Sequence, residues 1–320
     1  MTHSVIRAMG LLSTVEGLFV AGLLPYLIEA TGSVATTNAI EAAFWITMSI
    51  AELPTAYLQA RLGGRKALLF AVTLRALAFM LLYFAGRNSI LVTVGMMLAG
   101  VAVTFLTGTF SMQVRLAAAK FGWEVDYTRF SSDMSMVRQL GLVCGCLASY
   151  FVIRYLGVSS IWIACTLVSL PLFLYVFQTW DHVSGAHVHP PFGHYYASFQ
   201  AITQLPPLRN AILLDATLII LTYAMLYNNA MAFVLAVAGT TLSEICIRQV
   251  ILEKLPTDQA AAVSSIQSLL QNVAGAGAFL VLSLALTRAD LSRIWLLAGL
   301  LLCLISFLAA RALIGTKSER

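Results

Sequence analysis

Long apolar segments separated by short polar ones run through the whole chain. Each of about ten such segments approaches the roughly 20 apolar residues that an α-helix needs to cross the hydrocarbon core of a bilayer. In chain order they cover residues 8–30, 37–59, 67–86, 90–112, 134–155, 159–178, 208–227, 230–251, 261–286 and 294–313. The pattern therefore predicts an all-α, polytopic transmembrane helical bundle of about ten spans.

The segment 181–207 interrupts this pattern. It is polar, contains His and Pro, and is longer than a tight connection between two spans requires. We interpret it as a cytoplasmic linker. It would separate an N-terminal six-helix bundle, residues 1–180, from a C-terminal bundle of about four helices, residues 208–320.

Composition supports the same class of protein. Sixty per cent of the 320 residues are apolar and ten per cent are charged, and the mean hydropathy is +0.87. A water-soluble domain with these values would lack the polar side chains to cover its surface, so the lipid bilayer must be the solvent for most of the chain. The five cysteines all lie in apolar segments, where cysteine behaves as a small hydrophobe, and we expect neither disulfides nor a metal site.

The positive charges predict the orientation. Most of the 19 Lys and Arg residues fall in alternate loops, and cytoplasmic loops are the ones enriched in these residues. This distribution predicts a multi-pass protein of the cytoplasmic membrane with both termini in the cytoplasm. It also accounts for the net charge of +5 without nucleic-acid binding.

The stretch from Glu52 to Lys66, ELPTAYLQARLGGRK, closes the second span and forms the first inner loop. It resembles the signature between helices 2 and 3 of the major facilitator superfamily, Glu-x-Pro-Thr-Gly-x-Leu-Ala-Asp-Arg-x-Gly. The resemblance implies a carrier whose helical bundles rock against each other around a midplane site. It assigns the following residues to a loop that either fixes orientation or contributes to a cytoplasmic gate: Pro54, Arg61, Gly63, Arg65 and Lys66.

The chain also departs from that pattern. The acidic residue of the signature is Ala60 here, and its first glycine is Ala56. If the last three spans correspond to family helices 10 to 12, helices 8 and 9 are missing and the C-terminal half is shortened. These departures leave open a carrier of reduced size or a non-transporting remnant or scaffold membrane protein.

Ionisable residues inside apolar spans are costly to insert and usually mark a pathway or an interior pair. Four such residues are our candidates for proton coupling or for the substrate pathway: Glu16, Glu52, Arg75 and Asp215. Glu16 and Asp215 could instead pair with Arg75, and Glu52 could serve folding alone beside Pro54.

Glu52 is the sharpest candidate, because Glu41, Trp45, Met48 and Glu52 recur at helical spacing and would line one inward face. A carboxylate in a cavity of low dielectric can exchange a proton near neutral pH. The sequence thus predicts a secondary active transporter of a small solute of unknown class, with proton coupling as a hypothesis. It contains no enzyme motif and calls for no cofactor.

Overall fold

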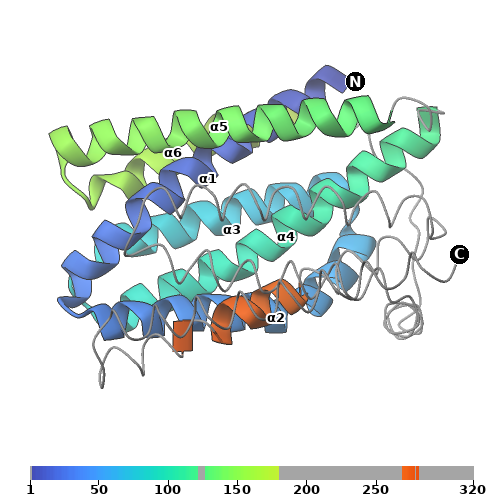
Figure 1. The fold of residues 1–320 in the computed structure, drawn as a ribbon. Helices are drawn as coiled ribbons and strands as arrows, with labels where there is room; N and C mark the ends of the chain where they lie inside the picture. The colour runs from blue at the N-terminus through green and yellow to red at the C-terminus, as the bar shows by residue number, and fades with distance from the viewer. Residues whose placement is uncertain (1, 122–126, 180–268, 278, 281–320) are drawn as a thin grey trace, which may run out of the picture. The chain divides into compact units, whose positions relative to one another are not determined.

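The computed structural model describes residues 2–121, 127–179, 269–277, 279 and 280, and these form α-helices joined by short turns (Figure 1). Six helices account for most of them. They are α1 (Thr2–Thr31), α2 (Val34–Leu62), α3 (Gly64–Ala85), α4 (Ser89–Phe121), α5 (Tyr127–Leu156) and α6 (Ser160–Thr179). Each of these helices overlaps one of the six apolar segments before residue 180, and several extend past them, as α4 does to Phe121.

Five of these helices are long and apolar enough to cross a membrane. The qualifying stretches are Ile6–Thr31, Gly64–Ala85, Ser89–Leu106, Met136–Leu156 and Ser160–Gln178. Helix α2, which contains Glu41 and Glu52, is not among them. The expected linker at 181–207 and the spans after it lie outside the described residues, apart from the helical residues 269–277, 279 and 280.

The chain divides into two compact units. Among the described residues, unit 1 holds α1, α3 to α6 and all of α2 except Glu41–Ser49. Unit 2 holds Glu41–Ser49 together with residues 269–277, 279 and 280.

Within unit 1 the most extensive helix contact joins α1 to α5, and α3 packs against α4 and α6. Glycines bring α1 and α5 together: a Cβ atom at Gly141 would lie 2.8 Å from Gly10 O, and one at Gly145 would lie 2.7 Å from Leu18 N. Small residues allow such backbone approach, which is how helices associate in a membrane. Two glycines four residues apart, as at positions 141 and 145, predict such close helix packing from the sequence, and the structure shows it.

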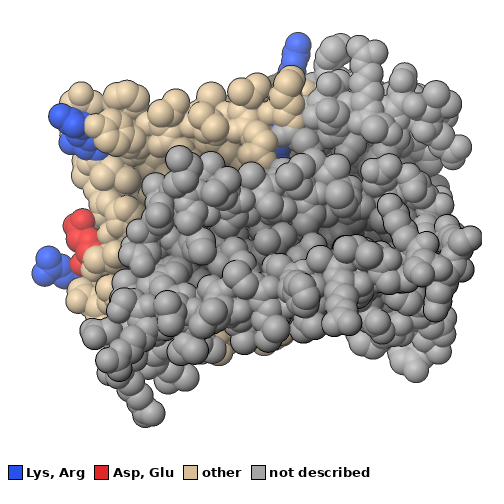
Figure 2. All heavy atoms as spheres, in the orientation of Figure 1, with Lys and Arg blue, Asp and Glu red and all other residues tan. Residues whose placement is uncertain are grey.

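Apolar side chains face outward along the described helices, among them Ile50, Phe84, Leu147 and Leu167. Figure 2 shows this uncharged surface between charged side chains at the ends of the described part. Lipid covers such a surface, because hydrocarbon chains solvate it as well as a protein interior would.

Candidate functional site

Helix α2 carries a buried face that contains two acidic residues. Its members recur at intervals of three, four and seven residues and are Glu41, Met48, Glu52, Thr55 and Gln59, each at most 7% exposed. Trp45 lies on the same face and is partly exposed. The face expected from the helical spacing is therefore the buried one. It contains more polar residues than the sequence analysis had singled out.

Glu52 lies near the middle of this face and is 4% exposed. One turn later, the Thr55 hydroxyl donates to the Glu52 backbone oxygen at 3.1 Å. Pro54 lies between them inside α2, with an exposed ring. Glu52 is thus a carboxyl group enclosed by protein in a helix whose regular backbone bonding is interrupted by proline.

In unit 2, residues 41–49 pack against the helical residues 269–277. The indole of Trp45 lies so close to Gly275 that a Cβ atom there would be 2.9 Å from Trp45 Cδ2. Asn272, one turn before Gly275, is buried as well. Glycine at position 275 therefore makes room for the indole.

Arg75 lies in the interior of unit 1, on α3, and is 2% exposed. Its guanidinium carbon lies 5.4 Å from the centroid of the Phe79 ring and 5.8 Å from that of Phe19 on α1. Glu16 lies on the same helix as Phe19, three residues before it. The pairing of Glu16 with Arg75 stays a prediction. Asp215 lies outside the described residues.

An aromatic cluster surrounds this arginine. Trp162 of α6 stacks on Phe79 with ring centroids 5.9 Å apart, and Tyr26 of α1 meets Trp162 edge-on at 4.9 Å. The Tyr26 hydroxyl donates to the Leu82 backbone oxygen on α3 at 2.5 Å. The cluster ties α1, α3 and α6 together around Arg75.

The signature loop is a tight turn between α2 and α3. Gly63 adopts φ +78°, a conformation that favours glycine, and its backbone nitrogen donates to Gln59 O at 3.1 Å. Arg61 is exposed and lies over the Tyr57 ring at 4.5 Å, and Lys66 is exposed. These two side chains therefore lie at the surface.

Arg65 has a different environment. Its Nη2 donates to the Phe177 backbone oxygen at 2.5 Å, and its guanidinium lies over the Phe177 ring at 4.8 Å. The bond satisfies a carbonyl in the last turn of α6, where a positive charge also complements the helix dipole. Arg65 therefore joins the start of α3 to the end of α6.

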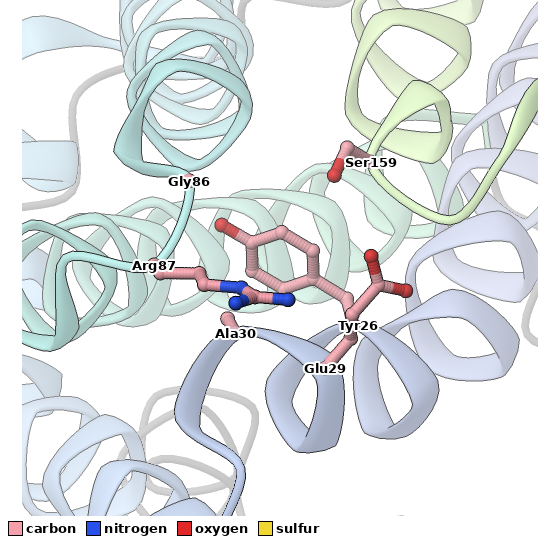
Figure 3. Close-up of a pocket in the computed structure, with 6 residues that line it drawn as sticks. All are labelled: Tyr26, Glu29, Ala30, Gly86, Arg87 and Ser159. Carbon is pink, nitrogen blue, oxygen red and sulfur yellow. The ribbon is translucent and has the colours of Figure 1, made fainter.

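A small cavity of about 90 Å³ lies where α1 ends, where α3 turns into α4 and where α6 begins (Figure 3). Its walls are formed by Tyr26, Glu29, Ala30, Gly86, Arg87 and Ser159. It contains none of the candidate residues predicted from the sequence. Its size suits a few water molecules rather than a metabolite.

Sequence reasoning missed one residue, Gln59. It is buried, and its side-chain amide bonds to the backbone of α4. The available signal was its spacing, seven residues after Glu52 and so two turns further along the same face.

No family model matches this sequence, and no curated protein matches it by sequence. Many solved structures share its fold, and three of them are transporters with the following likeness. The human organic anion transporter MFSD10 (TETRAN) is 13% identical with a TM-score of 0.65, and the match covers 96% of this chain and 98% of that one. The nucleoside transporter NupG is 11% identical with a TM-score of 0.62, covering 98% of each chain. The E. coli fucose:proton symporter FucP is 14% identical with a TM-score of 0.58, covering 97% and 98%.

Proposed function

We propose that this chain, which has the fold of the major facilitator superfamily transporters and crosses the membrane several times, is a secondary active transporter of a small solute. The observation that carries the proposal is the likeness to three transporters along nearly the full length of both chains. Transport proceeds by alternating access, in which helical bundles rock around a midplane site. The protein works in the cytoplasmic membrane, with both termini in the cytoplasm and no catalytic chemistry of its own.

The substrate is proposed only as a small molecule, without a chemical class. The three similar transporters are named for an organic anion, a nucleoside and fucose, which differ in charge and size. Their shared fold therefore supports transport without favouring one of these classes.

Proton coupling through Glu52 is the second part of the proposal. One of the three similar structures is a proton symporter. Glu52 is enclosed by protein, and an enclosed carboxyl group that gains and loses a proton changes the charge inside the bundle. Glu16 or Asp215 would act as a second titrating group, with Arg75 as the counter-charge of Glu16.

The first experiment is a thermal-unfolding screen of the purified protein against organic anions, nucleosides, sugars, amino acids and lipophilic cations. A ligand that binds only the folded state raises the melting temperature. At 100 times its Kd it increases the free energy of unfolding by about 2.7 kcal/mol. The compound that produces a shift is then tested for uptake into proteoliposomes. A reproducible shift followed by uptake supports the proposal.

Glu52→Gln tests the coupling in the same vesicles. The amide keeps the size of the side chain but cannot carry a proton, so we expect a pH gradient to drive no net uptake. Exchange of solute across the membrane without a gradient should persist. Glu29→Gln is the matched control, because Glu29 is exposed on α1. Gradient-driven uptake that survives in Glu52→Gln would contradict coupling through this residue.

A non-transporting remnant or scaffold membrane protein is the alternative function. The observation that favours it is Ala60, since the signature position that normally carries an acid has no charge here. Cooperative unfolding that no compound shifts, together with absent uptake across the whole panel, would favour this alternative.

A further inference from the structure

The Gln59 side chain holds α4 by its backbone. Its amide nitrogen Nε2 donates to the backbone oxygens of Thr104 and Phe105 at 3.2 and 3.0 Å. A glutamine amide has two N–H donors, so this contact uses both of them. Gln59 itself is 4% exposed. A buried donor pair that is fully used fixes the distance and the angle between two helices more tightly than apolar packing does.

Gln59 and Glu52 lie on the same face of α2. Seven residues are close to two helical turns, and Thr55 lies between them on that face. All three side chains are buried, at 4%, 4% and 3% exposure. A rotation of the segment after Pro54 that released Gln59 would therefore also turn Thr55 out of its present surroundings.

Pro54 makes such a rotation possible. Proline has no backbone N–H, so the helical bond from residue 54 to the Ile50 oxygen is absent, and its ring crowds the preceding turn. The helix after Pro54 is consequently less firmly attached to the helix before it. Gln59 lies on the far side of this weak point.

We infer that Gln59 is a positioning residue: it sets the rotation of the end of α2 on α4 and thereby keeps Thr55 buried. This anchoring does not rest on the proposed function. On the other side of the turn, Arg65 attaches α3 to the Phe177 oxygen. The loop that lacks an acid at Ala60 is thus held by one contact on each side of Gly63.

The experiment measures thiol labelling in a chain whose natural cysteines have been replaced. Thr55→Cys reports on the rotation, since Thr55 is buried beside Gln59. Leu58→Cys, at 44% exposure, is the reactive control, and Ala71→Cys, fully buried on α3, reports general loosening of the fold. Each is labelled with a water-soluble maleimide, with and without Gln59→Met.

Methionine keeps the length of the side chain and removes both donors. Two lost hydrogen bonds of about 1 kcal/mol each should speed labelling at position 55 by roughly tenfold or more. Labelling at position 71 should stay slow, and labelling at position 58 should stay fast. If Gln59→Met does not fold, Gln59→Leu is used, because its side chain also lacks both N–H donors.

Unchanged protection of position 55 would overturn the inference. An equal increase at positions 55 and 71 would also overturn it, since Gln59 would then support the fold in general. The measurement needs neither solute nor gradient. A chain that shows the expected labelling but transports no solute would therefore disprove the proposed function and leave the positioning role of Gln59 in place.

Discussion

At the scale of the residue, Arg75 is the most demanding side chain in unit 1. A charged group at the centre of a bilayer costs about 2.5 to 3.5 kcal/mol on insertion scales. Two phenyl rings offset part of that cost. One of these rings belongs to α1 and the other to α3. Arg75 therefore stabilises the contact between the two helices only while both rings are present.

A double-mutant cycle tests the predicted pairing of Glu16 with Arg75. We expect Glu16→Gln to lower the melting temperature of the natural chain, because Arg75 would lose its acidic neighbour. In an Arg75→Met background the same change should have little effect. A coupling energy of about 0.5 to 3 kcal/mol, measured by unfolding in detergent, would agree with a direct interaction. Strictly additive effects would show that the two residues act independently.

Single residues were predictable from the sequence where their chemistry conflicted with their surroundings. Glu52 and Arg75 stood out as charges in apolar segments, and the structure buries both. Gln59 did not stand out, because it binds backbone oxygens. Every residue carries a backbone oxygen, so nothing in the sequence of α4 identifies Thr104 and Phe105 as the partners of Gln59.

At the scale of the element, the contact of α1 with α5 depends on glycine. A Cβ atom at Gly145 would collide with the Thr14 oxygen, which belongs to the backbone and cannot turn aside. We expect Gly145→Ala to destabilise the protein by about 1 to 3 kcal/mol, in line with overpacked cores. Thermal unfolding measures the effect.

Gly277→Ala is the control for this substitution. A Cβ atom at Gly277 meets nothing within 4 Å. Alanine also favours a helix over glycine by about 1 kcal/mol, so this change should leave stability equal or higher. Similar losses at both positions would argue against a specific α1 to α5 contact.

The helices of the first part were predictable because each is a long apolar run, and length alone identifies such a run. Their pairing was not. Gly141 and Gly145 indicated a close contact, but the spacing of two glycines does not name the partner helix. The structure shows that the partner helix is α1, whose backbone at Gly10 and Gly17 contacts these two glycines.

At the scale of the whole molecule, the distribution of Lys and Arg predicts the side of the membrane on which each loop lies. We expect a cysteine at Lys66 to react with an impermeant thiol reagent only from the cytoplasm, and one at Arg87 only from outside. Both side chains are exposed, so burial will not mask the result. Reaction of both from the same side would refute the predicted orientation.

The fold itself is shared far more widely than its sequence. The signature loop predicted a transporter fold, and three solved transporters share the fold of this chain at 11% to 14% identity. A transmembrane helical bundle requires mainly long apolar helices and small residues where the helices touch. Many different sequences meet these requirements. Most of the C-terminal half lies outside the described residues, and the expected absence of two helices there stays a prediction.

The glycine contact of α1 with α5 has a mechanical consequence. Two helices whose backbones are in contact have no compressible layer of side chains between them. They therefore move as one rigid unit. If the chain works by alternating access, as proposed, the bending must be concentrated where the bundle is more compliant. In unit 1 the regular helix bonding is interrupted in α2, at Pro54.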